Sequence, residues 1–389
     1  LAWLVTGMLL EHDVRLERVA LAMDGPQTLA ARVRRLRRCL DGAVDTQAIY
    51  QQLIARAARG WRVPRAFVLL DTTSVGGRIY FVRAALSHAS RAIPLAWRAY
   101  EGRSATIGFA DYRPLLEASD RMLPAWMERV LVADRGFMHV ALARWVLERG
   151  WRIRLRAKGS LGITLPDGTG GRIARRRRKF GEARYLDTVS IGAQQVGPFG
   201  LTLSWPRYGR DRTLHVLSDD PPTVRTLWEF ERREAVEAAF RDDKSAGFQL
   251  ERSRITDPHR LDRLLGAMAL AQVFLKSIGT RVLLEERRRD VDAHYDEPGA
   301  SVLQLGVRQV RMDVLRGRAP KVEVALLLDD DIRGMPGEGR VLKRFHARKG
   351  LPYGKRWIPP QSYESRNAMW WLPKGIMPRF PEGEPPVLR

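Results

Sequence analysis

Two short apolar runs, each followed by an aspartate, constrain the fold of this chain more than any other feature. Asp71 follows the run Phe67–Leu70, and Asp134 follows the run Val130–Ala133. Uninterrupted apolar runs of this length are typical of buried strands in an open α/β sheet. Each strand would deliver a carboxylate at its carboxyl end, the edge of such a sheet where ligands usually bind. The pattern therefore predicts an α/β fold with two acids at one sheet edge.

A third acid stands on a segment predicted to be one long helix, from Thr226 to Lys244. At about 100° per residue, four of its residues fall at roughly 0°, −60°, −20° and −40° around the axis and form one narrow stripe. They are Phe230, Arg233, Glu237 and Lys244. Arg233 would suit a bidentate grip on phosphate beside Glu237, and Lys244 would supply a point charge. The alternative is a solvated amphipathic helix, in which Glu234, at roughly +40°, is the close rival of Glu237.

The three acids Asp71, Asp134 and Glu237 predict a site for two divalent metal ions. Hard carboxylate oxygens favour Mg²⁺ or Mn²⁺ over softer metals. Two such ions can activate a water and stabilise a departing oxygen, which cleavage of a phosphodiester at neutral pH requires. The single cysteine, Cys39, excludes an internal disulfide and a cysteine-based zinc cluster.

These motifs together resemble those of a known family, the DDE transposases of bacterial insertion sequences, and within it the "insertion sequence four" group. The signature of that group is Tyr-x2-Arg-x3-Glu-x6-Lys. Here its spacing is intact from Phe230 to Lys244, with Phe in place of Tyr. The segments Leu70–Ser74 and Val132–Phe137 also look like the first two motifs of the group. The similarity extends from Trp61 to Gly279.

The resemblance implies a DDE transposase that cleaves transposon DNA ends and transfers them into target DNA with two Mg²⁺ or Mn²⁺ ions. Asp71, Asp134 and Glu237 would be its catalytic residues and metal ligands, while Phe230, Arg233 and Lys244 would bind DNA. In the family the tyrosine is thought to hold DNA near the reacting phosphate, so Phe230 keeps the ring and lacks the hydroxyl. The implied partners are double-stranded DNA, as terminal inverted repeats and as target, and a second copy of the chain in the DNA complex.

Two other functions fit the same residues. The first is a ribonuclease-H-like nuclease that cuts DNA without strand transfer. The second is a non-catalytic DNA-binding remnant or repressor, which the Phe at position 230 and the absence of a starting Met favour mildly. Three acids in a basic chain argue against the remnant, because a protein that only binds DNA has no use for them.

The order of the predicted elements indicates a ribonuclease-H-like mixed sheet with flanking helices. Three strands, a helix, a strand, a helix and a strand are expected between residues 61 and 157, and this order would place the first and fourth strands side by side. Predicted domains are a helical DNA-binding region at 1–60, a catalytic domain at 61–279 with a β-rich insertion at 158–215, and a C-terminal region at 280–389. The last region begins with helices and ends in a tail rich in Pro and aromatic residues.

The charge of the chain agrees with a nucleic-acid partner. Its 389 residues carry a formal net charge of +23, and the pI is near 11.0. Such an excess is an electrostatic footprint for a polyanion, although a solvated basic surface is the alternative for any one cluster. Two clusters are predicted to bind DNA: Arg34, Arg35, Arg37 and Arg38 on one helix, and the run Arg175, Arg176, Arg177, Arg178 and Lys179 in the insertion.

A membrane protein is not expected. The sequence contains no run of roughly 20 uninterrupted apolar residues. The opening segment Leu1–Leu10 lacks a basic leader and is better explained as a core helix than as a signal peptide. The sequence therefore predicts a cytoplasmic, nucleoid-associated bacterial protein.

Overall fold

The computed structural model describes residues 1–61, 63–88, 91–102, 107–176, 183–205, 213–245, 247–294, 300–321, 324 and 326. All of them belong to one compact unit that extends from Leu1 to Pro352. Arg177, Arg178 and Lys179 of the predicted basic run lie outside the described residues, as does the Pro- and aromatic-rich tail. The predicted domain boundaries at 60 and 279 stay predictions.

Within the described residues, ten strands form one mixed sheet in the order β3-β2-β1-β4-β5-β10-β9-β8-β6-β7. Its first five strands are β1 (Arg65–Val75), β2 (Ile79–His88), β3 (Arg91–Glu101), β4 (Glu128–Ala133) and β5 (Arg152–Arg156). β2 is antiparallel to β1 and β3, whereas β1, β4 and β5 are parallel to one another. This order and these directions confirm the predicted ribonuclease-H-like sheet, in which the first and fourth strands are neighbours.

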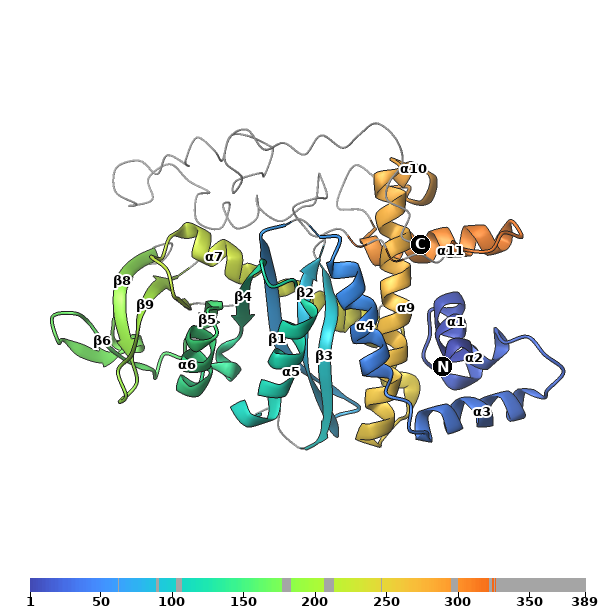
Figure 1. The fold of residues 1–389 in the computed structure, drawn as a ribbon, viewed down its shortest axis with the longest axis horizontal. Coiled ribbons are helices and arrows are strands. Elements are labelled where there is room, and N and C mark those ends of the chain that lie inside the picture. Colours follow the sequence, from blue (N-terminus) through green and yellow to red (C-terminus); the bar gives the residue numbers. More distant parts are fainter. Residues whose placement is uncertain are drawn as a thin grey trace. The chain divides into compact units, whose positions relative to one another are not determined.

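The predicted β-rich insertion is present and extends the sheet instead of forming a separate layer (Figure 1). Its strands are β6 (Gly162–Thr164), β7 (Gly170–Arg172), β8 (Ala183–Ile191) and β9 (Val196–Ser204). β10 (Leu214–Ser218) joins them to the central sheet, because it pairs antiparallel with both β5 and β9.

Helices precede, interrupt and follow the strands (Figure 1). The N-terminal helices are α1 (Ala2–Glu11), α2 (Leu16–Leu21), α3 (Leu29–Asp41) and α4 (Thr46–Ala58). Helices between strands are α5 (Phe109–Met122) and α6 (Val140–Glu148), with short 3-10 helices η1 (Arg135–Phe137) and η2 (Ile173–Arg175). After β10 come α7 (Val224–Glu231), α8 (Glu234–Lys244), η3 (Leu250–Ser253), α9 (Pro258–Leu284), α10 (Arg288–Val291) and α11 (Val302–Leu315).

Helix α9 begins where its sequence predicts. The side chain of Asp257 accepts a hydrogen bond from the backbone N–H of Arg260 at 2.7 Å, and Pro258 occupies the first helical position. By length and composition α9 could cross a membrane, but it is mostly buried against other helices and the sheet, as a core helix is.

Local chemistry also fixes the first hairpin and the outer strand. Gly76 and Gly77 have φ angles of +59° and +70°, which favour glycine and turn β1 tightly into β2. At the outer strand β3, the backbone N–H of Trp97 donates to Gln47 of α4 at 2.8 Å, and that of Ala99 donates to Asp262 of α9 at 2.7 Å. Two helices thus satisfy an edge that would otherwise remain open to pairing.

Two local predictions were wrong. Asp71 does not end its strand, because β1 continues to Val75 through the hairpin with β2; only the parallel ladder with β4 ends at Leu70. The predicted single helix from Thr226 to Lys244 is two helices. Around Arg232 and Arg233 each backbone N–H bonds to the carbonyl three residues earlier instead of four, as in the bond from Arg233 N–H to Phe230 C=O at 3.0 Å. This tight turn separates α7 from α8.

Candidate active site

A row of charged residues crosses the sheet where the parallel ladder ends. Leu70 pairs with Ala133, and Ala133 pairs with Leu155, so the next residues in the three strands are Asp71, Asp134 and Arg156. On the other side, Arg83 of β2 is the direct partner of Asp71. Residues opposite one another in paired strands share a face, so the register places both predicted aspartates in one row, between two arginines.

Helix α8 brings the third acid to this row. Nη1 of Arg233 lies 3.2 Å from Oδ2 of Asp71 and 2.7 Å from Oε1 of Glu237. One guanidinium therefore joins a strand carboxylate to a helix carboxylate 166 positions further along the chain (237 − 71). Phe230 packs beneath it, with its ring centre 5.9 Å from Cζ of Arg233, and is 5% exposed. Phe230, Arg233 and Glu237 thus lie together, and their roles in binding DNA or metal stay predictions.

Asp134 has a different cation. It directly follows β4 and precedes η1, and its Oδ1 lies 3.3 Å from Nη1 of Arg156 at the end of β5. Arg156 is nearly buried, whereas the Asp134 side chain is 29% exposed and can be reached from solvent. Two strand acids and one helix acid are therefore each in contact with an arginine.

The most buried acid of the three is Asp71, with a side chain 15% exposed. Burial raises its pKa from 3.8 to about 6, although Arg233 and the N–H of Thr72, which donates to Oδ1 at 2.8 Å, act in the opposite direction. The nearby charges of Asp134 and Glu237 raise the pKa further. The cations at the site therefore leave the negative charge of Asp71 only partly compensated.

The donor chemistry of this cluster fits a hard divalent cation. All three acids are carboxylates, and additional positive charge would relieve the unfavourable burial of Asp71. As the side chains are placed, the guanidinium of Arg233 lies between Asp71 and Glu237. Within the part of the chain that the structure describes, no group of three Asp, Glu, His or Cys side chains is arranged to hold a metal ion.

Lys244, the last member of the predicted stripe, lies at the end of α8. Its Nζ is 3.7 Å from Oε1 of Glu251, and its side chain is 20% exposed. The structure thus places Lys244 in an ion pair with a residue beyond the helix, whereas Arg233 contacts the acids. Its predicted role in DNA binding stays a prediction.

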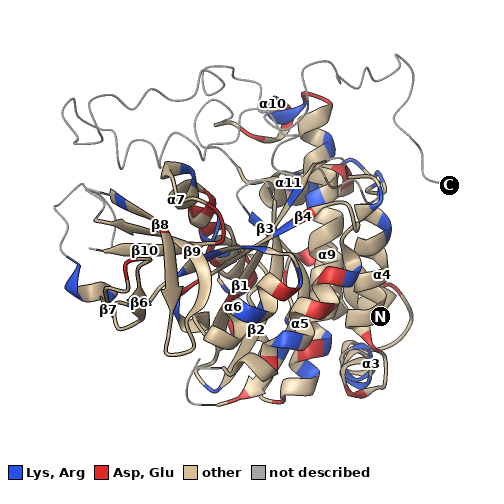
Figure 2. Ribbon diagram, turned by 60° about the vertical axis from the view of Figure 1, so that its left-hand side comes forward, with Lys and Arg blue, Asp and Glu red and all other residues tan. Residues whose placement is uncertain are grey.

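The N-terminal basic cluster is exposed along α3, where Lys and Arg are blue in Figure 2. Its members are Arg34, Arg35, Arg37 and Arg38. The buried face of the same helix carries Val33, Leu36 and Leu40. The second cluster is described only in part: Arg175 is exposed, and Arg176 is half-buried. DNA binding by either cluster stays a prediction.

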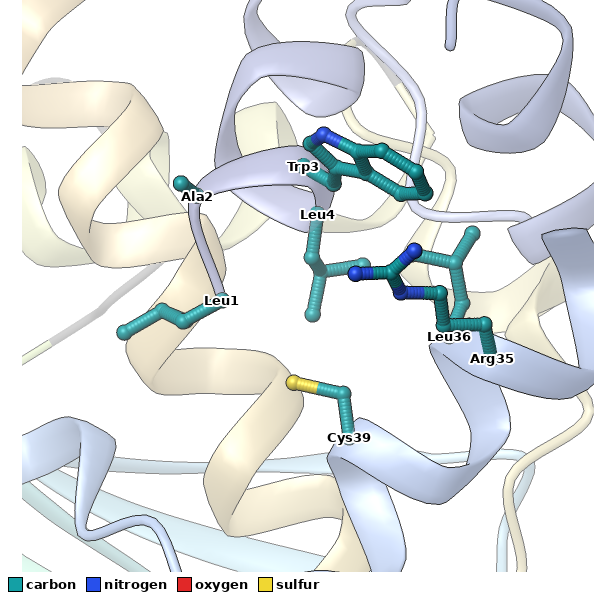
Figure 3. A pocket seen from close by; sticks show the side chains of 7 residues that line it. All are labelled: Leu1, Ala2, Trp3, Leu4, Arg35, Leu36 and Cys39. Carbon is teal, nitrogen blue, oxygen red and sulfur yellow. The ribbon is translucent and has the colours of Figure 1, made fainter. Parts of the chain in front are cut away.

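Arg35 also forms the wall of a pocket of about 290 Å³ between α1 and α3 (Figure 3). Its guanidinium carbon lies 3.9 Å from the ring centre of Trp3. The pocket is lined by Leu1, Ala2, Trp3, Leu4, Arg35, Leu36 and Cys39. None of these residues belongs to the carboxylate row, so the pocket is separate from the candidate active site.

The sequence reasoning missed a second charged cluster that fixes α7 to the sheet. The Glu229 side chain is fully buried and accepts hydrogen bonds from Arg65 at 3.1 Å, Arg154 at 2.6 Å and Arg225 at 2.8 Å. A signal for this cluster exists in β5, where Arg152-Ile-Arg-Leu-Arg156 alternates with period two. Alternate strand residues share a face, so the pattern predicts three arginines on one face of the sheet and requires acidic partners for them.

Comparisons with known proteins add little. No family model matches the chain, and no curated protein matches it in sequence. A cryo-EM structure of a piggyBac transposase synaptic complex with hairpin DNA aligns with a TM-score of 0.43 and 13% identity, over 92% of this chain and 73% of that chain. A TM-score below 0.5 assigns no family, so the functional argument depends on the residues of the site.

Proposed function

We propose that this chain is a DDE transposase of the "insertion sequence four" kind, which cleaves the ends of a mobile DNA element and transfers them into target DNA. The observation that carries the proposal is that Asp71 has both other acids, Asp134 and Glu237, as electrostatic neighbours, although the three side chains, as the described part of the chain places them, do not form a metal site. Two of these acids directly follow Leu70 and Ala133, which are paired in neighbouring strands, and the third shares the Arg233 guanidinium with Asp71. The order strand, strand and helix is the one that the sequence resemblance implies.

Asp71, Asp134 and Glu237 would hold Mg²⁺ or Mn²⁺. When bound, two such ions supply an activated water or 3′-hydroxyl and stabilise the departing oxygen of the phosphodiester. Arg233 would grip a phosphate, because a guanidinium offers several donors in one plane and Nη1 accounts for both of its carboxylate contacts. Arg156 holds Asp134 in the row through a contact at 3.3 Å.

The proposed partner is double-stranded DNA, both as terminal inverted repeats and as target, and two copies of the chain would assemble on it. The net charge of +23 supports a polyanionic partner. The exposed arginines of α3 are proposed to bind the inverted repeats, and the basic run of the insertion to contact the DNA backbone. A nucleoid-associated location would follow from this partner.

Two assays on an end sequence of the element test the function. The first measures Mg²⁺-dependent nicking of the end, and the second measures integration of a pre-cleaved end into a plasmid. We expect both to succeed with the wild-type chain. Nicking without integration would support the nuclease alternative, and DNA binding without nicking would support the non-catalytic remnant.

Asparagine variants test the acids. Asp71→Asn and Asp134→Asn should each abolish nicking while DNA binding survives, because loss of a ligand charge mainly weakens metal binding. Asp41→Asn is the matched control, since Asp41 is an exposed acid at the end of α3. Cleavage by the wild-type chain in the presence of a chelator would contradict the proposed metal dependence.

A further inference from the structure

An ion pair, both of whose side chains are buried, connects helix α8 to the sheet. Nη1 of Arg83 lies 2.6 Å from Oδ2 of Asp243, and the two side chains are 1% and 0% exposed. The other oxygen of Asp243 accepts a hydrogen bond from Gln272 of α9. The Arg83 guanidinium also lies 5.1 Å from the ring centre of Phe81 and 5.2 Å from that of Phe240.

Stability alone does not explain such a pair. Two charges lose their hydration when they are buried, and well-packed apolar residues of similar volume often stabilise a protein as much or more. The apolar contact is already present here, since Phe81 and Phe240 meet edge to face at 5.5 Å. Apolar packing has no direction, so it tolerates small shifts of a helix along a sheet. An ion pair with hydrogen-bond geometry does not tolerate them.

The position of the pair connects it to the candidate active site. Arg83 is the direct strand partner of Asp71. Asp243 is six residues after Glu237 on α8, a distance of about 9 Å along a helix. The pair therefore ties the strand beside one predicted metal ligand to the helix that carries another. A second tie, from Arg91 of β3 to Asp242 at 2.8 Å, restrains the same end of α8.

We propose that Arg83 and Asp243 are positioning residues, whose buried ion pair sets the place of Glu237 relative to Asp71 and thereby the affinity of the site for divalent metal. The inference rests on the proposed function, since it takes the three carboxylates as the metal ligands. Neither residue touches the reacting groups; both act through the register of α8 on the sheet.

The test measures Mn²⁺ binding by titration calorimetry, with the full chain in the absence of DNA. Asp243→Asn removes the charge and leaves Arg83 buried without its ionic partner. The double variant Arg83→Met/Asp243→Leu replaces both charges with apolar side chains of similar size and restores a stable fold if the single variant loses it. We expect Mn²⁺ affinity to fall about tenfold in both, the low end for residues that orient metal ligands.

A second measurement separates positioning from general destabilisation. Nicking by both variants should recover at saturating Mg²⁺ and remain depressed at limiting Mg²⁺, with DNA affinity unchanged. The matched control is Asp292→Asn, because Asp292 is also buried, 1% exposed, and paired with Arg288 and Arg308 away from α8. We expect this variant to lose stability and keep its Mn²⁺ affinity.

The possible outcomes are distinct. If the double variant binds Mn²⁺ with wild-type affinity, the inference is overturned, because the ion pair then has no effect on the position of the metal ligands. Equal loss of affinity in Asp292→Asn would also overturn it, since any destabilised chain would then behave in the same way. A wild-type chain that binds no Mn²⁺ would overturn the proposed function, and the inference with it.

Discussion

The burial of Asp71 should make this acid destabilising, and its removal should stabilise the folded chain. Its folded-state pKa is raised from 3.8 to about 6, mainly by burial and in spite of Arg233. A carboxyl with a raised folded-state pKa favours folding fully below the unfolded value, and this contribution is lost as pH rises through the folded value. Above pH 6 the ionised Asp71 therefore costs stability that a neutral residue does not.

The size of the effect follows from the shift. A rise from 3.8 to about 6 corresponds to about 3 kcal/mol of unfolding free energy at pH 8 and to about half of that at pH 5. The Asp71 side chain is only 15% exposed, so solvent screening reduces this value little. Asp71→Asn keeps the shape and removes the charge, so we expect it to be more stable than wild type by up to this amount.

Unfolding in guanidinium chloride at pH 8 and pH 5, with EDTA present, measures the difference. The control is Asp292→Asn, whose effect should have the opposite sign. Burial acts to raise the pKa of Asp292, but hydrogen bonds from Ala300, Arg308 and other groups lower it overall. That contribution to stability is present above the unfolded pKa, so its loss should destabilise the chain at pH 8. The reasoning is refuted if Asp71→Asn is no more stable than wild type at pH 8, or if its advantage does not shrink at pH 5.

Three further variants probe the anchors and the phosphate grip. Glu229→Gln should destabilise the chain by about 3 kcal/mol, because it leaves the buried Arg154 short of a counter-charge; denaturant unfolding measures this, and a loss below 1 kcal/mol contradicts it. Arg233→Ala should weaken binding of a pre-cleaved end by roughly one to two decades, the equivalent of a charge-assisted contact of about 1.5–3 kcal/mol. Lys244→Ala should act in the same direction, and both losses should shrink as salt rises. Competition of the pre-cleaved end against random duplex across a salt series measures both losses. The control is Arg241→Ala, since Arg241 is exposed on the same helix. If both variants bind the end as tightly as wild type at low salt, the stripe does not bind DNA.

The sequence predicted the central sheet and most of the stripe because both depend on short-range pattern. The runs before Asp71 and Asp134 are continuous and apolar, which leaves few alternatives to buried parallel strands. Phe230, Arg233 and Glu237 stay on one side despite the unpredicted break between α7 and α8, because the tight turn rotates the chain by nearly the same angle per residue as an α-helix. Arg233 thus keeps its face, while Lys244, about three turns further, is at the helix end and pairs with Glu251.

The rest could not be predicted from local pattern, because it depends on register between distant segments. Arg156 contacts Asp134 only because β5 pairs with β4 at Ala133. Arg83 faces Asp243 only because the hairpin sets β2 against β1 while α8 crosses the same face. The break between the helices has the same origin: α7 is bonded through Glu229 to β1 and β5, and α8 through Asp242 and Asp243 to β3 and β2.

The structure also changes what the net charge of +23 means for DNA binding. In β5, Arg152 contacts Glu128 and Asp219, Arg154 contacts Glu229, and Arg156 contacts Asp134. Arg83 is paired with Asp243 in the same way. Arginines held by acids within the fold are not free to displace counterions from DNA, so they should add little to the salt dependence of binding. That dependence should instead follow the exposed arginines of α3 and the site arginine that a phosphate can reach, which makes the total charge a poor guide to DNA affinity and the exposed charge a good one.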